Sequence, residues 1–209
     1  GNKATFTKND KYYDAKAVKT KNLEMFLVQD PKTAAQNFDN GKVDYATINS
    51  TLVDKYKGKD TFTTFNEGFL FYLNLNFQVK TLADKNVREA LSYAINRKDL
   101  CENVLKDGSR AATGMVPSQL SKSPAGKDFR DDAGVLVGYD VKKAQEYLDA
   151  AKKELGTDTI TVDLLYGTDE SPMDTMAEYL QGSFTKLKGL KVNMVATVKK
   201  DRIYNRQAN

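Results

Sequence analysis

Two long stretches of the chain carry apolar residues at spacings of three and four, which is typical of helices with one buried face. In the first stretch these positions are Val87, Ala90, Leu91, Ala94 and Ile95. In the second they are Val141, Ala144, Leu148, Ala151 and Leu155. An aspartate precedes each stretch, Asp84 or Asp140, and its carboxylate can accept hydrogen bonds from the free N–H groups of a first helical turn. The pattern therefore predicts two amphipathic helices, the second ending at Gly156.

Shorter helices are predicted where start and stop signals bracket a few apolar residues. The pair Asp30-Pro31 favours a helix over residues 32–39, because aspartate caps a helix and proline suits its first position. Asn40-Gly41 then favours its end. Further helices are expected over residues 51–56 and 98–105, and after Ser171-Pro172.

Stretches rich in β-branched and aromatic residues predict the strands. These strands are expected over residues 4–8, 21–28, 43–46, 62–65, 69–76, 159–166 and 190–198. The last two flank a helix, which predicts a right-handed βαβ unit with parallel strands. Residues 109–138 hold two of the four prolines and are expected to form a long irregular loop. The predicted fold class is α/β with mixed strands.

Charge and hydropathy narrow the classes of function. The chain has 32 lysine and arginine residues against 28 aspartate and glutamate residues, a net charge of +4, and the two signs are interspersed. No basic stripe interleaved with aromatics is present, so a nucleic-acid partner is not expected. No apolar stretch approaches the roughly 20 residues of a membrane-spanning helix.

Histidine and cysteine, which often serve as catalytic groups or metal ligands, are absent or scarce. The chain has no histidine, which excludes Ser-His-Asp and Cys-His nucleophiles and the common zinc sites. Cys101 lies at helical spacing among apolar residues and is expected to be a small buried hydrophobe. Asp169, Glu170 and Asp174 could form an acid/base pair or a cation site, but acidic residues near a helix start commonly complement its dipole. No glycine motif for nucleotides occurs, so neither an enzyme nor a cofactor or metal site is predicted.

Polar side chains near predicted strand ends are the candidates for ligand binding. They are Tyr72, Asn74, Asn76 and Tyr166. In open α/β sheets ligands bind beyond the carboxyl ends of strands, and amide and phenol groups can hydrogen-bond a peptide backbone. Alternatively, these groups simply satisfy the strand ends.

Four motifs carry a resemblance to a known family. They are residues 8–16 (KNDKYYDAK), 33–45 (TAAQNFDNGKVDY), 72–76 (YLNLN) followed by 86–97 (NVREALSYAINR), and the helix beginning at Tyr139-Asp140. Together they resemble the extracellular solute-binding proteins that serve oligopeptide, dipeptide and nickel importers. The third motif is similar to that family's VR-x-A-(L/I)-x-x-A-I-(D/N)-R run, whereas the usual tryptophan of the first is Tyr13.

The resemblance implies a two-lobed protein that closes on its ligand, and a periplasmic-binding-protein-like lobe with a mixed sheet flanked by helices. On this mapping residues 1–22 are the tail of the first lobe and residues 23–209 are most of the second. Arg206 is similar in position to an arginine that faces the ligand cleft, and Gly167 stands where some relatives have asparagine. Family members continue beyond residue 209 into a G-W-x-x-D-Y region that this sequence does not contain.

The resulting hypothesis is an oligopeptide-capturing subunit of an ABC importer. Its partners would be the peptide and the permease subunits, and it would contact the membrane only through a lipid anchor outside these residues. It would lie at the extracellular face of the cell membrane or in the periplasm. The alternatives are a binder of dipeptides, nickel chelates or sugars, and a non-catalytic surface interaction module.

Overall fold

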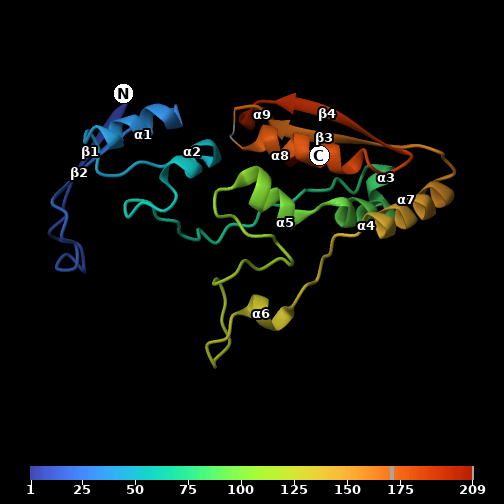
Figure 1. Cartoon of the computed structure of the whole chain (residues 1–209), viewed down its shortest axis with the longest axis horizontal. Coiled ribbons are helices and arrows are strands. Elements are labelled where there is room, and N and C mark those ends of the chain that lie inside the picture. Colours follow the sequence, from blue (N-terminus) through green and yellow to red (C-terminus); the bar gives the residue numbers. More distant parts are fainter. Residues whose placement is uncertain (170–171, 209) are drawn as a thin grey trace. The chain divides into compact units, whose positions relative to one another are not determined.

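The computed structural model describes residues 1–169 and 172–208, with the side chains of 206–208 left out of the description. The chain divides into two compact units, Gly1–Lys57 and Gly58–Asn209 (Figure 1). The sequence places a lobe boundary elsewhere, after residue 22. That boundary stays a prediction, although strand pairing joins both of its sides within the first unit.

The first unit combines a β-hairpin with two short helices. Strands β1 (Lys3–Thr7) and β2 (Asn22–Phe26) pair antiparallel. They are followed by α1 (Pro31–Asp39) and α2 (Ser50–Tyr56). The carboxylate of Asp30 accepts the N–H groups of Lys32 and Thr33, as the capping signal predicts.

The hairpin has one wholly apolar face. Its register sets Ala4 opposite Met25 and Phe6 opposite Leu23, and paired residues project from the same side of a ladder. Phe6, Leu23 and Met25 each leave half or more of their surface exposed, at 51%, 51% and 56%. The described residues therefore leave this face uncovered.

The second unit holds most of the helices and a parallel pair of strands. In chain order its elements are α3 (Lys80–Ala83), α4 (Lys85–Ala94), α5 (Arg97–Asp99), the π-helix η1 (Leu100–Leu105), α6 (Phe129–Ala133), α7 (Val141–Leu155), β3 (Ile160–Gly167), α8 (Met173–Phe184), β4 (Leu190–Thr197) and α9 (Lys199–Ala208). Strands β3 and β4 pair in parallel from Ile160 opposite Leu190 to Gly167 opposite Thr197. The predicted parallel strand–helix–strand unit is confirmed.

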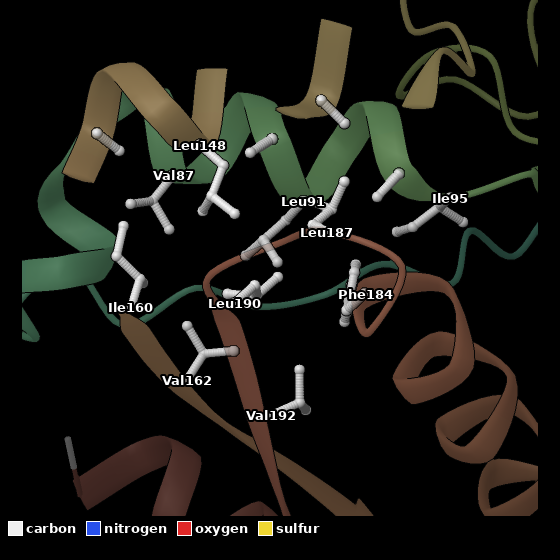
Figure 2. Close-up of a cluster of buried hydrophobic side chains, with 14 of the residues drawn as sticks. Val87, Leu91, Ile95, Leu148, Ile160, Val162, Phe184, Leu187, Leu190 and Val192 are labelled. Carbon is white, nitrogen blue, oxygen red and sulfur yellow. The ribbon is translucent and has the colours of Figure 1, made fainter. Parts of the chain in front are cut away.

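One apolar core joins α4, α7, α8, β3 and β4. The helices α4 and α7 pack along each other, and their apolar stripes face β3, β4 and α8 (Figure 2). Val87, Leu148 and Ile160 are fully buried in it. Burying such side chains stabilises the fold by about 1.5–3 kcal/mol each. The structure buries eight of the ten residues in the stripes predicted from periodicity, and the other two, Val141 and Leu155, are half-buried against the core.

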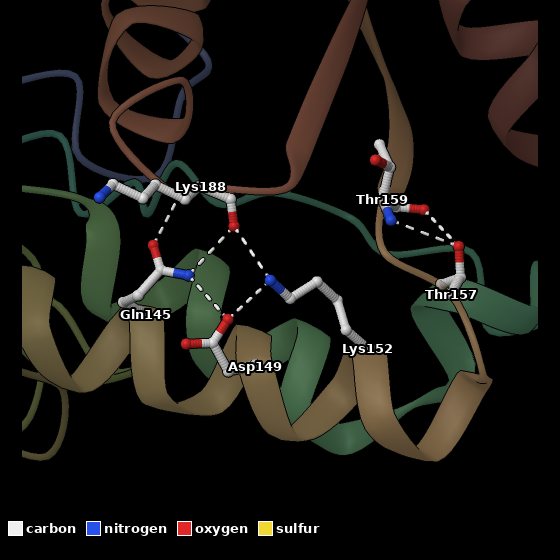
Figure 3. Close-up of polar contacts among 6 residues, drawn as sticks. All are labelled: Gln145, Asp149, Lys152, Thr157, Thr159 and Lys188. Atoms are coloured by element: carbon white, nitrogen blue, oxygen red, sulfur yellow. Dashed lines mark hydrogen bonds and ion pairs between the residues drawn. The ribbon is translucent and has the colours of Figure 1, made fainter.

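A polar clamp fixes helix α7 to the turn before β4 (Figure 3). The side chain of Gln145 accepts the N–H of Lys188 at 2.7 Å and donates to the Lys188 carbonyl at 3.1 Å. Lys152, which pairs with Asp149 at 2.7 Å, approaches the same carbonyl. Because the clamp holds main-chain groups, it sets where β4 begins.

The side chain of Arg97 binds main-chain groups at the end of α4. Its guanidinium donates to the carbonyl and the hydroxyl of Ser92, at 3.1 and 3.2 Å, and to the carbonyl of Gly138 at 3.4 Å. The last bond connects the end of α4 to the approach to α7. The arginine of the 86–97 motif therefore has a structural role.

Three predicted strands are wrong. Residues 43–46, 62–65 and 69–76 form no strand in the described chain. β-propensity measures how well a side chain fits a half-buried surface, and it does not supply a partner for the backbone. The α/β class is confirmed, with the strands divided between two small sheets.

The loop predicted over residues 109–138 is largely irregular, with α6 and an isolated bridge between Lys122 and Asp128 inside it. Arg130 holds this loop together by donating to the hydroxyl of Thr113 at 2.6 Å and to the carbonyl of Gly134. Gly114 leaves the space that the guanidinium fills, because a Cβ there would lie 2.1 Å from Nη1.

Candidate functional site

The carboxyl ends of β3 and β4 form the first part of the candidate site. Tyr166 is half-buried and Gly167 is buried, and they pair in register with Ala196 and Thr197. The two parallel strands therefore end at the same level, and ligands bind beyond this edge in α/β sheets.

Hydrogen bonds hold the two chain segments together as they leave the sheet. The N–H of Thr168 donates to the carbonyl of Thr197 at 2.8 Å, and its hydroxyl donates to the same oxygen at 3.1 Å. The carboxylate of Asp169 accepts the N–H of Lys199, the first residue of α9, at 2.7 Å. The end of β3 and the start of α9 therefore form one fixed corner.

The segment 69–76 presents aromatic and amide groups on one side. Leu73 and Leu75 are half-buried and pack against the core, whereas Tyr72 and Asn74, which alternate with them, are exposed. Tyr72 leaves 64% of its surface exposed. Burial thus alternates over residues 72–75, although the described segment has no ladder partner. The exposed side can offer a phenol and a side-chain amide to a ligand.

Asn76 has a local structural role. Its side-chain oxygen accepts the N–H of Gln78 at 2.9 Å, and its carbonyl accepts the N–H of Val79 at 3.2 Å. This is the turn by which an asparagine side chain mimics the backbone, and it leads into α3. Of the two predicted asparagines, Asn74 is therefore the better candidate for ligand contact.

Arg206 lies in α9, and its side chain is outside the described part of the structure. Both α9 and α3, the helix that follows residues 69–76, contact β3. Of the elements that carry candidate residues, the structure thus shows α9 against β3, the strand that ends in Tyr166 and Gly167.

Two open hollows lie in the first unit, apart from these residues. One, of about 450 Å³, is lined by Asn2, residues 27–30 and Thr33. The other, of about 390 Å³, lies between the hairpin and the loop that joins its strands. Neither is lined by a predicted site residue.

The groups at the candidate site are hydrogen-bonding groups rather than reactive ones. Among the residues that the structure describes, no group of three or more acidic or cysteine side chains could hold a metal ion. Asp174 accepts the N–H of Thr175 at 2.7 Å in the first turn of α8, as a helix-start role predicts, whereas Glu170 lies outside the described residues. Within the described chain, no helix is both long and apolar enough to cross a bilayer.

Sequence patterns do not predict the contact that Asp169 makes. Its position favours a role at the helix that follows it, yet its carboxylate binds the start of α9, thirty residues further along the chain. The available signal is indirect: Val198, just before α9, has no side-chain group that could cap a helix.

Comparison with known proteins identifies the class. Residues 1–209 match the family model of the bacterial extracellular solute-binding proteins, family 5 (middle region). The chain belongs to this family, whose members are extracellular or periplasmic solute-binding proteins.

Individual relatives match this chain in sequence or in structure. The chain is 31% identical over 210 residues to the dipeptide-binding protein of Lactococcus lactis subsp. cremoris, covering 95% of this chain and 38% of the relative. It is 28% identical over 200 residues to the oligopeptide-binding protein OppA of Bacillus subtilis, covering 91% of this chain and 35% of the relative. The structure of Listeria monocytogenes OppA bound to peptide matches with a TM-score of 0.82 and 31% identity, over 99% of this chain and 42% of that one. The chain thus spans about two fifths of the length of the relatives that it matches.

Proposed function

We propose that this chain is part of a solute-binding protein that captures oligopeptides outside the cell and delivers them to the permease subunits of an ABC importer. The observation that carries the proposal is the match of nearly the whole chain to a peptide-bound OppA. The protein would be held at the membrane by a lipid anchor and would catalyse no reaction.

The chemistry of the candidate site supports a ligand gripped by its main chain. Tyr72 and Asn74 expose neutral donors and acceptors, and the ends of β3 and β4 add backbone groups. Such groups suit the amides of an extended peptide without selecting its side chains. Arg206 on α9 would serve as a bidentate donor to a peptide carboxylate or carbonyl.

We further propose a two-lobed arrangement in which residues 1–22 belong to one lobe and residues 23–209 to the other. In that arrangement these residues form only part of the cleft wall, so they alone would bind peptide weakly. Micromolar binding of a peptide by residues 1–209 in isolation would contradict the proposal that the binding cleft needs both lobes.

Thermal unfolding of the full-length protein tests the ligand class. The panel consists of dipeptides, tripeptides, mixed-sequence peptides of about five to eight residues, nickel chloride with and without free histidine, and maltose. A ligand at about 100 times its Kd stabilises the folded state by about 2.7 kcal/mol, so binding appears as a rise in Tm. We expect a rise with the longer peptides and none with nickel or maltose.

Other outcomes of the same panel would replace the proposal. A rise confined to dipeptides, to nickel or to maltose would assign that ligand instead. No rise with any member would favour a surface interaction module. Hydrolysis of a chromogenic peptide, abolished by a point substitution, would show an enzyme.

A further inference from the structure

The residue before helix α9 has no side chain that could cap the helix. The carbonyl of Val198 accepts the N–H of Arg202 at 3.0 Å, which makes Val198 the residue that precedes the helix. A valine side chain accepts no hydrogen bond, so residue 198 cannot cap the first turn through its side chain.

Asp169 supplies the acceptor from another segment. Its Oδ1 lies 2.7 Å from the N of Lys199, at the positive end of the α9 dipole, where a carboxylate is favoured. Thr168, its neighbour, is bonded twice to the carbonyl of Thr197, two residues before Lys199. The loop that leaves β3 therefore sets the position from which α9 departs.

The helix that is held in this way carries Arg206. Arg206 lies seven positions after Lys199, which is close to two full turns and about 10 Å along the axis. Any tilt at the start of α9 is therefore carried to the arginine, whereas the strand ends at Tyr166 and Gly167 stay in the sheet.

We infer that Asp169 is a positioning residue for peptide binding: by capping α9 from the end of β3, it holds the Arg206 helix in register with the strand ends. The inference rests on the proposed function, because it assigns Asp169 a role at the same site. Asp169 itself touches no ligand in this scheme.

The test compares substitutions in the full-length protein, using the peptide that raises Tm most in the panel above. A lost cap shifts a local equilibrium by about 1 kcal/mol, so Asp169→Ala should weaken the Kd about three- to tenfold. Asp169→Asn keeps an acceptor oxygen and should stay within about twofold of the wild type. Asp174→Ala, the matched control, removes a nearby carboxylate that accepts a bond within α8 and should leave the Kd unchanged.

A second substitution separates positioning from simple capping. In Asp169→Ala/Val198→Ser, the serine caps α9 locally but does not link it to β3. The double variant should regain the Tm lost in Asp169→Ala and keep the weakened Kd. Recovery of the Kd together with Tm would show that Asp169 is only a helix cap and would overturn the inference. An unchanged Kd in Asp169→Ala would overturn it as well.

Failure of the proposed function can be told apart from failure of this inference. Hydrogen exchange of the Lys199 amide reports the contact without any ligand. If no peptide binds the wild type but Asp169→Ala speeds this exchange, the contact stands and the peptide function fails. Unchanged exchange of the Lys199 amide would refute the positioning role whichever ligand the protein takes.

Discussion

The phenol of Tyr179 on α8 donates to the carboxylate of Asp99 at 2.7 Å, and this bond joins α8 to the segment that follows α4. Hydrogen bonds from Asn103 and from Tyr179 hold the pKa of Asp99 below its ordinary value. Burial and the neighbouring carboxylate raise the pKa of Tyr179, so its hydroxyl stays protonated throughout the neutral range. The pair is therefore a donor and a charged acceptor at physiological pH.

Removing the hydroxyl should destabilise the protein in a pH-dependent manner. We expect Tyr179→Phe to lower Tm by roughly 2–4 °C near neutral pH, as for the loss of one hydrogen bond whose charged acceptor is screened by solvent. A lowered folded-state pKa gives stability that is present above the unfolded value, about 3.9, and is lost as pH falls through the folded value. The difference in Tm between the two proteins should therefore shrink below about pH 4. A difference that is constant from about pH 7 to pH 3 would contradict this assignment.

The turn that precedes β4 requires a glycine at position 189, and this requirement can be tested by substitution. Its φ is +90°, and a Cβ there would lie 2.9 Å from the carbonyl oxygen of Asp158. Gly189→Ala should therefore lower the free energy of unfolding by more than about 1 kcal/mol. Gly182, an exposed glycine of α8 where a Cβ would meet no atom within 4 Å, is the matched control. Gly182→Ala should leave stability unchanged or raise it by up to about 1 kcal/mol. Denaturant titration measures both, and equal effects would refute the argument.

The two asparagines of residues 69–76 should behave differently. Asn74→Ala should weaken peptide binding about three- to tenfold, the usual effect of one lost hydrogen bond, and leave Tm nearly unchanged. Asn76→Ala should lower Tm, because its side-chain oxygen holds the turn into α3. Calorimetric titration with the panel peptide and thermal unfolding separate the two effects. A reversal of this pattern would move the ligand contact to Asn76.

Arg206 can be tested by changing the ligand as well as the residue. Arg206→Lys keeps the charge but loses the planar fork that binds a carboxylate through two bonds. If Arg206 binds the carboxylate, the variant should bind a peptide with a free carboxyl terminus about tenfold more weakly. It should bind the same peptide with an amidated terminus about as well as the wild type does. Equal losses for both peptides would indicate a contact to a peptide carbonyl instead.

The thiol of Cys101 should react slowly with thiol reagents. Burial, followed by the charges of Asp107 and Glu102, raises the pKa of its thiol, so little thiolate is present near neutral pH. We expect a thiol reagent such as DTNB to modify the folded protein more slowly than it modifies glutathione. The rate should rise when the protein is unfolded in concentrated guanidinium chloride. Equal rates in the folded and unfolded states would show that the thiol is freely accessible.

Features that depend on neighbours in sequence were predictable. Asp84 and Asp140 cap their helices, and Gly156 ends α7 in the left-handed conformation. Each of these interactions spans only a few residues, so the local sequence contains both partners. The apolar stripes of α4 and α7 were predictable for the same reason.

Features that depend on residues distant in sequence were not predictable. The β-prone composition of residues 69–76 predicted a strand, but it could not indicate whether another strand lies alongside. At the candidate site, Tyr166 was placed correctly near the end of a strand. The contact between Asp169 and Lys199 joins residues thirty apart, and no local pattern identifies such a pair.

The apolar face of the β1–β2 hairpin has a practical consequence at the bench. A sample of residues 1–209 would expose Phe6, Leu23 and Met25 to every other molecule in solution. Exposed apolar faces of β-hairpins promote self-association. Light scattering from such a sample should therefore increase with protein concentration. Charged replacements such as Leu23→Lys would make it easier to purify and crystallise.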